Sequence, residues 1–228
     1  MKKWQTTYLI QYKNTRIELN IMKRFFDIFF SLIGLTLVLP ILLVIAIAIK
    51  IDSSGPIFFF QKRIGINGKV FSIIKFRTMV VNAENMEGGI FNTANDPRVT
   101  KTGNFLRNSS LDEIPQFINI LRGDMSFVGP RPPVTYELGD YEGWDADLKK
   151  SFSVKPGVTG LAQVSGRNEL NWDEKTKLNL EYIEKYRSYG LLFDIKIILL
   201  TIVKVLKNEG SHELSDNIEA DKKRMNKK

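Results

Sequence analysis

The chain has 228 residues, enough to bury the core of one domain or of two small ones. It contains no cysteine, which excludes disulfides, thiolate nucleophiles and cysteine-based zinc sites, and its single histidine, His212, argues against Ser-His-Asp and histidine-rich metal chemistry. Catalysis would therefore rest on carboxylates, Lys, Arg, Tyr or a hard cation such as Mg²⁺. The net charge of +8 indicates an anionic partner: nucleic acid, anionic lipid or a phosphorylated substrate.

A mixed polar and basic extension covers residues 1–20, and an uncharged, mostly apolar segment follows at residues 28–49. As a straight helix this segment would be about 33 Å long, enough to cross the core of a bilayer. The apolar run is too long for a cleavable signal. Pro40 lies just past the middle of the segment, where it removes a backbone hydrogen bond and kinks or breaks a helix.

The residues on both sides of this apolar segment are rich in Lys and Arg, so the positive-inside rule places both of its ends in the cytoplasm. We expect a re-entrant helical hairpin bent at Pro40, which agrees with both the basic flanks and the central proline. A kinked helix that spans the bilayer is the alternative, because proline is tolerated in membrane helices.

Two strands are predicted after the apolar segment, over residues 56–61 and 70–78, which are rich in Phe and Ile. The dipeptide Asn67-Gly68 between them is a signal for a hairpin turn. Residues 82–102 contain Gly, Asn, Asp and Pro with weak periodicity, and we expect a loop with a short helix there.

The second half of the chain alternates helices with turns. Apolar spacing over residues 111–121 predicts a helix, with Asp112 as its cap and Pro115 in the tolerated first turn. Residues 153–168 are rich in glycine and have no helical period, so we expect turns and short strands. Residues 171–187 predict a helix with a charged outer face.

Two adjacent carboxylates, Asp112 and Glu113, lie where the first of these helices is predicted to begin, after Arg107 and before a Pro-Arg-Pro turn at residues 130–132. A helix start has unpaired N–H groups and the positive end of the helix dipole, so it binds phosphate and keeps carboxylates ionised. An ionised Asp beside a bound phosphate can act as a nucleophile. The structural alternative is a capping box formed by Ser110 and Glu113.

A second membrane contact is suggested by residues 191–206, which are strongly apolar. The segment also includes Asp194, Lys196 and Lys204, which would make a full span of the bilayer costly. A helix lying in the membrane interface and an ordinary core helix both fit this pattern.

Four ordered blocks of sequence resemble the bacterial sugar transferase family, the monotopic polyprenyl-phosphate phosphoglycosyl transferases of the small single-domain type. The blocks are KRFFDIFFSLIGL, IDSSGPIFFFQKRIGINGKVFSIIKFRTM, LRNSSLDEIPQFINILRGDMSFVGPRP and VKPGVTGLAQVSGRN, and the match runs from about Met22 to Lys207. The resemblance implies that an Asp attacks the β-phosphate of a UDP-sugar and releases UMP. A polyprenol phosphate such as undecaprenyl phosphate then takes the sugar-phosphate from the enzyme.

The resemblance also assigns roles to residues of this chain. Asp112 matches the nucleophile, and Glu113 matches the neighbouring carboxylate that helps to hold Mg²⁺, for which Mn²⁺ can substitute. Basic positions near the substrate phosphates match three arginines: Arg107, Arg131 and Arg167. Two polyanionic substrates must meet in such a site, so guanidinium groups and a divalent ion are needed to offset their repulsion.

Three further positions are less clearly assigned. Lys75 is placed with the phosphate-binding residues, the alternative being that it and Arg77 contact lipid head groups. Asp194 matches an acidic position of the family and is a candidate active-site residue. The re-entrant helix of the family is bent at a Ser-Pro pair, whereas this chain has Leu39-Pro40, so the kink is kept without the hydroxyl.

These observations predict an α+β fold: a small mixed catalytic domain over residues 52–207, with a re-entrant membrane helix hairpin over residues 21–51 and interfacial amphipathic helices. Residues 1–20 would be a basic extension, and residues 208–228 a polar, frayed tail. The expected location is the cytoplasmic face of the cell inner (cytoplasmic) membrane, in a monotopic arrangement. The exposed apolar hairpin would also favour a homodimer.

The expected partners are a UDP-sugar, polyprenyl phosphate and the membrane. Nucleic acid is not expected, because the chain has no basic stretch interleaved with aromatic residues. Two other functions stay open: a glycosyltransferase that releases UDP, and a non-catalytic basic anchor or scaffold at the membrane. The sequence specifies neither the sugar nor the product, whether capsule, other exopolysaccharide, lipopolysaccharide or glycoprotein.

Overall fold

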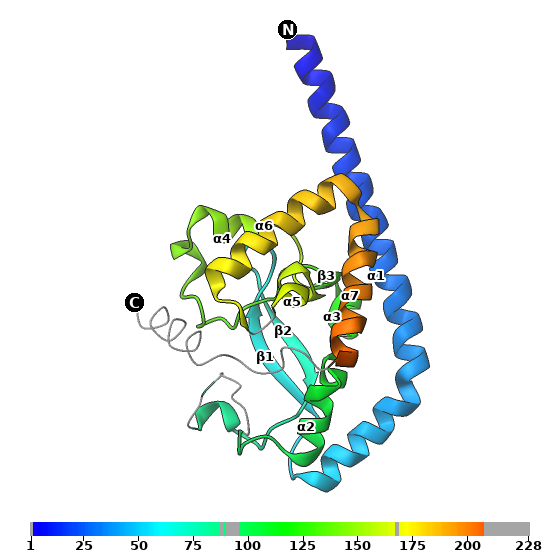
Figure 1. Cartoon of the computed structure of the whole chain (residues 1–228), viewed down its shortest axis with the longest axis vertical. Coiled ribbons are helices and arrows are strands. Elements are labelled where there is room, and N and C mark those ends of the chain that lie inside the picture. Colours follow the sequence, from blue (N-terminus) through cyan, green and yellow to red (C-terminus); the bar gives the residue numbers. More distant parts are fainter. Residues whose placement is uncertain (1, 87–88, 90–95, 167–168, 208–228) are drawn as a thin grey trace.

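The computed structural model describes the backbone of residues 2–86, 89, 96–166 and 169–207, with side chains from residue 20 onward (Figure 1). The described part contains both helices and strands in one small domain packed beside a long N-terminal helix. This confirms the mixed helix and strand content expected from the sequence. The predicted polar tail at residues 208–228 lies outside the described residues.

The long helix α1 (Lys2–Asp52) runs past one side of the domain and changes direction in its second half (Figure 1). Pro40 lies inside α1, which continues through it as a single helix and is not split into two. The part from Asn20 to Asp52 is long and apolar enough to cross a membrane, by length and composition. Most of its large apolar side chains are exposed, including Phe25, Leu37 and Val44.

The β-hairpin predicted around Asn67-Gly68 is confirmed with slightly shifted bounds. Strands β1 (Phe58–Ile64) and β2 (Val70–Phe76) pair in antiparallel fashion along their full length. The turn between them places Asn67 at φ 50° and Gly68 at φ 80°, the left-handed region that Asn and Gly tolerate best. The local signal in the sequence therefore identified the turn correctly.

Helix α2 (Lys101–Asn108) was not predicted, although a short helical turn, η2 (Ala83–Asn85), does lie in the expected loop. The helix predicted over residues 111–121 is divided into a 3-10 turn, η3 (Leu111–Glu113), and helix α3 (Gln116–Arg122). Asp112 therefore lies within the tight turn and does not cap the α-helix. Pro115 explains the division, because it has no N–H to continue the ladder of helical hydrogen bonds.

The glycine-rich region forms one short strand and one short helix that was not predicted. Strand β4 (Gly157–Thr159) pairs in parallel with β3 (Ser126–Val128), and helix α5 (Leu161–Ser165) follows. Two more helices, α4 (Ala146–Ser151) and α6 (Trp172–Tyr189), pack together, and a further 3-10 turn, η4 (Tyr141–Gly143), precedes α4.

Helix α6 confirms the helix predicted over residues 171–187. It begins with a capping box, in which the side chain of Asn171 accepts the Glu174 N–H and the Glu174 carboxylate accepts the Asn171 N–H. Both hydrogen bonds join residues three apart, so the start of this helix is specified by its own sequence.

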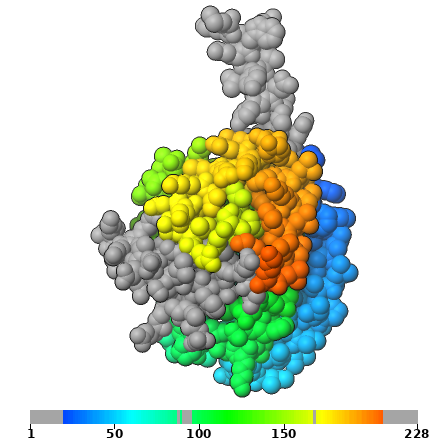
Figure 2. Space-filling model, in the orientation of Figure 1, coloured from blue at the N-terminus to red at the C-terminus, as the bar shows by residue number. Residues whose placement is uncertain are grey.

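Helix α7 (Leu191–Lys207) lies beside α1 on one side of the molecule (Figure 2). One face of α7 is buried in the core through Phe193 and Ile197, which pack against residues of β3 and α6. The opposite face exposes large apolar side chains, including Leu192, Leu199 and Leu206. The helix thus docks on the domain and still leaves an apolar surface uncovered.

The buried clusters of the domain include residues of the β-hairpin and of the apolar part of α1, Asn20–Asp52, which is called the membrane segment below. Ile45 and Ile49 of α1 pack with Phe76 of β2 and Leu106 of α2, so the end of α1 is part of a buried cluster. A neighbouring cluster joins β2 to α3 and the start of β3. These clusters hold β2, α2 and α3 in fixed positions around the site described next.

Candidate active site

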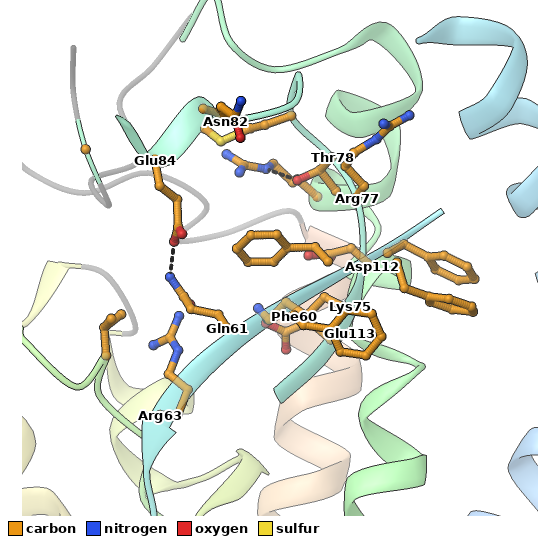
Figure 3. A pocket seen from close by; sticks show the side chains of 18 of the residues that line it. Phe60, Gln61, Arg63, Lys75, Arg77, Thr78, Asn82, Glu84, Asp112 and Glu113 are labelled. Carbon is orange, nitrogen blue, oxygen red and sulfur yellow. Dashed lines mark hydrogen bonds and ion pairs between the residues drawn. The ribbon is translucent and has the colours of Figure 1, made fainter. Parts of the chain in front are cut away.

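A cavity of about 510 Å³ opens beside the β-hairpin and brings together most of the predicted site residues (Figure 3). They come from four parts of the chain: β2, the end of α2, the turn η3 and the Pro-Arg-Pro segment after β3. The predicted residues in its wall are Lys75, Arg107, Asp112, Glu113 and Arg131.

The turn η3 presents the two adjacent carboxylates at this cavity, where Asp112 is 9% and Glu113 8% exposed. Ser110 precedes them in the left-handed region, at φ 56°, and makes no side-chain capping hydrogen bond. The capping box proposed as the structural alternative is therefore wrong. The carboxylate of Glu113 instead contacts two cations across the cavity.

The two cations on Glu113 are Lys75 and Arg131. Lys75 donates from Nζ to Glu113 Oε1 at 2.7 Å, and Arg131 donates from a terminal nitrogen to the same oxygen at 3.3 Å. Burial lowers the pKa of Lys75 in spite of the opposing effect of Glu113. Burial also acts to lower the pKa of Arg131, but its contact with Glu113 outweighs this and the pKa is raised.

Arg107 reaches the cavity from the last turn of α2. Its Nε donates to the hydroxyl of Thr78 at 2.9 Å, and burial lowers its pKa. The helix packs closely on Thr78, because a Cβ placed on Gly103 would lie 1.9 Å from the carbonyl oxygen of that residue. Glycine is disfavoured inside helices, but here no other residue fits.

The start of α2 is joined to the end of the membrane segment. Asp52, the last residue of α1, accepts a hydrogen bond from the Thr102 N–H at 2.7 Å, and the hydroxyl of Thr100 caps the Gly103 N–H. Unpaired N–H groups at a helix start are stabilised by such acceptors. The helix that presents Arg107 is thus fixed at its other end to α1.

Arg77, for which contact with lipid head groups was the alternative, is buried and binds backbone carbonyl oxygens. Its guanidinium donates to the carbonyl oxygens of Ser54 at 2.6 Å and Ser53 at 2.7 Å, immediately after α1. Gly55 is at φ 120°, and a Cβ there would collide with the guanidinium. Arg77 therefore ties β2 to the exit of the membrane segment, and these contacts replace the suggested binding of lipid head groups.

Arg63 is a cationic residue of the cavity that sequence reasoning missed. It donates from a terminal nitrogen to the Pro132 carbonyl at 2.9 Å, and burial lowers its pKa to about 10. Alternation along β1 was the signal available for it. Cross-strand pairing puts Arg63 opposite Phe71, on the same face of the hairpin as Lys75.

One predicted residue, Asp194, is not brought to the cavity, and a second is not placed by the structure. Arg167 lies outside the described residues. Asp194 is 1% exposed and is placed between α7, α6 and α1, where it accepts hydrogen bonds from Lys23 and from the hydroxyl of Tyr182, the latter at 2.9 Å. Burial raises the pKa of Asp194 although Lys23 opposes this. Its contacts hold the start of the membrane segment to the domain.

The cavity offers two adjacent carboxylates, which are part of the set of oxygen ligands that a hard cation such as Mg²⁺ needs. Within the described residues, no group of three or more His, Cys, Asp or Glu side chains is arranged to hold a metal ion. Asp112 and Glu113 offer carboxylate oxygens in the same wall. Mg²⁺ is commonly held by one or two carboxylates together with substrate phosphates, and these two residues fit that arrangement.

Comparison with known proteins finds a family model and several relatives that match this chain. The family model described as bacterial sugar transferase matches residues 18–208. The chain is 44% identical over 202 residues to a protein named galactosyl transferase CpsE from Streptococcus agalactiae, covering 84% of this chain and 43% of that protein. It is 44% identical over 194 residues to the Escherichia coli UDP-glucose:undecaprenyl-phosphate glucose-1-phosphate transferase, covering 84% and 42%.

The chain therefore spans less than half the length of these two relatives. A shorter relative, the uncharacterized sugar transferase EpsL of Bacillus subtilis, is 38% identical over 190 residues, which are 83% of this chain and 90% of that protein. The family model covers α1 from residue 18 onward, the β-hairpin and the cavity residues. The chain belongs to the bacterial sugar transferase family.

Proposed function

We propose that this chain transfers a sugar-1-phosphate from a UDP-sugar to undecaprenyl phosphate and releases UMP, as the first membrane step in the synthesis of a polysaccharide or glycoconjugate. The names of relatives from Escherichia coli and Komagataeibacter xylinus support a transfer of this kind. The observation that supports it most is the cavity in which Asp112 and Glu113 lie among Lys75, Arg107 and Arg131.

In the first step a carboxylate oxygen of Asp112 attacks the β-phosphorus of the UDP-sugar. The bond from that phosphorus to the bridging oxygen breaks, UMP leaves with this oxygen, and an acyl phosphate that carries the sugar forms on Asp112. In the second step an oxygen of the lipid phosphate attacks the same phosphorus, and Asp112 leaves as a free carboxylate. The anhydride is thus conserved in the lipid-linked diphosphate.

The cations of the cavity counter the charge of two phosphorylated substrates. Lys75, Arg107 and Arg131 would contact the phosphate oxygens, where charge-assisted hydrogen bonds are strongest. Glu113, with Asp112 beside it, would hold Mg²⁺. When bound, the ion would supply further neutralisation of the diphosphate. Glu113 contacts Lys75 and Arg131 in the structure, so these cations would turn toward phosphate when substrate arrives.

The attachment of α1 to the domain supports a monotopic arrangement with a re-entrant helix. Near the start of the apolar segment, Arg24 donates to the carbonyl oxygens of Ile120 and Leu121 at 2.5 and 2.7 Å. At its end, Asp52 contacts Thr102. A helix that spans the bilayer would place these two points on opposite sides of the membrane, whereas both are on one small domain.

The apolar surfaces of α1 and α7 would then face the lipid, with α7 lying in the membrane interface. The two helices are side by side and both expose large apolar residues (Figure 2). The basic flanks of the segment support a location of the domain on the cytoplasmic face. This position would let the cavity receive a soluble UDP-sugar and a membrane-bound lipid phosphate.

The test is the identity of the nucleotide product. We would incubate the purified chain with a panel of UDP-sugars, Mg²⁺ and undecaprenyl phosphate, and separate UMP from UDP by chromatography. Release of UMP that depends on a particular sugar is the expected result. Release of UDP would indicate a glycosyltransferase that moves the sugar without its phosphate. Absence of any nucleotide product with every donor would favour a non-catalytic anchor.

A further inference from the structure

A second polar pair, Gln61 and Glu84, lies in the wall of the same cavity. The two side chains point toward each other and form a hydrogen bond, with the amide of Gln61 donating to Glu84, in the cavity that Lys75, Asp112 and Glu113 also line (Figure 3). Neither residue has a role in the phosphate chemistry proposed above. Their chemistry differs from that of the cationic wall, because the pair brings a carboxylate and a neutral amide.

The hairpin places Gln61 next to the phosphate-binding lysine. Gln61 is opposite Ile73, and Phe59 is opposite Lys75, so Gln61 and Lys75 are diagonal neighbours on one face of the sheet. Such neighbours are about 7–8 Å apart. Lys75 in turn contacts Glu113, next to the proposed nucleophile.

Glu84 is held in place by the turn that carries it. The buried guanidinium of Arg98 donates to the carbonyl oxygens of Ala83 at 3.0 Å and Gly89 at 2.7 Å, on either side of Glu84. Arg98 is itself fixed by Asp96, which accepts from its Nε at 2.9 Å. The carboxylate of Glu84 is thus presented to the cavity from a braced turn.

The charge of Glu84 indicates which part of a substrate it would meet. No ion pair joins Glu84 to a cation among the residues that the structure describes, so its negative charge would repel a phosphate placed against it. A carboxylate accepts strong hydrogen bonds from hydroxyl groups, and a Gln amide can both donate to and accept from them. The pair therefore suits a polyol.

We propose that Gln61 and Glu84 form a subsite that binds hydroxyl groups of the transferred sugar. This inference rests on the proposed function, in which the β-phosphorus lies at Asp112. The sugar is bonded directly to that phosphate, so its ring must lie within one ring length of Asp112. The ribose of the nucleotide is separated from the same point by the α-phosphate. The position beside Lys75 therefore matches the sugar.

The proposal is tested with Glu84→Gln and Gln61→Ala, and with Glu142→Gln as a matched control at an exposed glutamate outside the cavity. Wild type and variants are compared for kcat/KM with UDP-glucose and UDP-galactose, which differ at one hydroxyl, and for inhibition by UMP. We expect Glu84→Gln to lower kcat/KM for the preferred donor by about tenfold or more, as expected when a hydrogen bond to a charged group is lost. The preference between the two donors should change, while inhibition by UMP and the melting temperature stay as in wild type.

Two results would overturn the assignment. Equal weakening of both donors together with weaker inhibition by UMP would place the ribose, and not the sugar, at this pair. Unchanged kinetics in Glu84→Gln and Gln61→Ala would show that the pair binds no part of the donor. Binding of UDP-sugar and of UMP, measured by calorimetry without turnover, gives the same comparison. A failure of the proposed function would appear separately, as wild type that releases no UMP.

Discussion

Lys75 and Glu113 form an ion pair in the wall of the cavity, with 2.7 Å between Nζ and Oε1 and side chains only 14% and 11% exposed. The lysine comes from a strand and the glutamate from a tight turn, so the pair exists only in the folded domain. It holds a cation at low solvent exposure beside the proposed nucleophile. The charge state of Lys75 should therefore be visible in the pH dependence of the reaction.

Burial lowers the pKa of Lys75 below its ordinary value of 10.5. Only the protonated form attracts phosphate, so kcat/KM should decline on the alkaline side as pH rises through this lowered pKa. In the unfolded chain the lysine keeps its proton to higher pH, so the stability contribution of this group rises with pH in the same window. A loss of activity in this pH range would reflect the loss of positive charge in the cavity, because deprotonation of Lys75 does not destabilise the folded chain.

The variant Lys75→Arg separates these effects, because a guanidinium keeps its proton to higher pH than a lysine ammonium in the same place. We expect its alkaline limb to move to higher pH, with some loss of activity at neutral pH from the changed geometry. The measurement is UMP release across pH at subsaturating donor. An alkaline limb that is the same in Lys75→Arg and wild type would assign it to another group.

Glu113 is expected to bind the metal ion in addition to contacting Lys75 and Arg131. Two adjacent carboxylates and an arriving diphosphate crowd negative charge, which a divalent ion relieves. EDTA should stop UMP release, and Mg²⁺ or Mn²⁺ should restore it. Glu113→Gln should lose most activity and need more metal, whereas Glu113→Asp keeps the charge with a shorter reach and should retain some. Full activity in EDTA, or wild-type behaviour of Glu113→Gln, would give Glu113 a structural role, in which it contacts Lys75 and Arg131.

Asp112 is expected to form the covalent intermediate. Asp112→Asn keeps the size of the side chain but removes the nucleophilic charge, so both UMP release and lipid product should be lost while the melting temperature is kept. Mass spectrometry of wild type incubated with UDP-sugar and Mg²⁺, but no lipid acceptor, should show a sugar-phosphate adduct on the peptide that contains Asp112. Substantial turnover of Asp112→Asn would move the nucleophile elsewhere, first to Glu113.

Features set by local sequence could be predicted, and features set by distant contacts could not. The Asn67-Gly68 turn and helix α6 depend on residues within three or four positions of each other, and both were found. Helix α2 was not predicted, and it contains Gly103, a residue that disfavours helices. Its close approach to the Thr78 carbonyl and the contact with Asp52, which explain the glycine, depend on the fold.

In the candidate site, too, the features set by local sequence could be predicted and those set by the fold could not. The carboxylate pair and its nearby arginines were visible as a motif, and the structure gathers most of them in one cavity. The different roles of Lys75 and Arg77, two positions apart, were not visible, because β2 ends at Phe76 and the alternation of side chains ends with it. Arg77 then turns to the exit of α1 while Lys75 stays in the cavity.

Asp194 is expected to stabilise the docking of the membrane segment through its buried contact with Lys23. Removing one partner of a buried ion pair leaves an uncompensated charge and costs about 3–5 kcal/mol of the free energy of unfolding. Lys23→Met and Asp194→Leu should each be destabilised, and the double variant should lose less than the sum. The measurement is chemical denaturation in detergent.

The exposed pair Glu181 and Lys185 is a matched control, because both side chains are 45% exposed. Lys185→Met should change the free energy of unfolding by no more than about 0.5 kcal/mol. If Asp194→Leu lost activity at unchanged stability, Asp194 would act in the reaction instead of in docking.

The topology of α1 can be tested directly, because the chain has no cysteine and single cysteines can be introduced without background. Thr6 and Lys69 lie before and after the apolar segment. Both ends of that segment contact the same domain, through Arg24 and through Asp52, so a re-entrant helix should leave Thr6→Cys and Lys69→Cys on the same side.

In right-side-out vesicles neither should react with an impermeant maleimide, and both should react after the membrane is opened with detergent. Inside-out vesicles are the control, in which both should react without detergent. Labelling of Thr6→Cys from the outside would show that α1 spans the bilayer, and the docking of both its ends on one domain would then have to be abandoned.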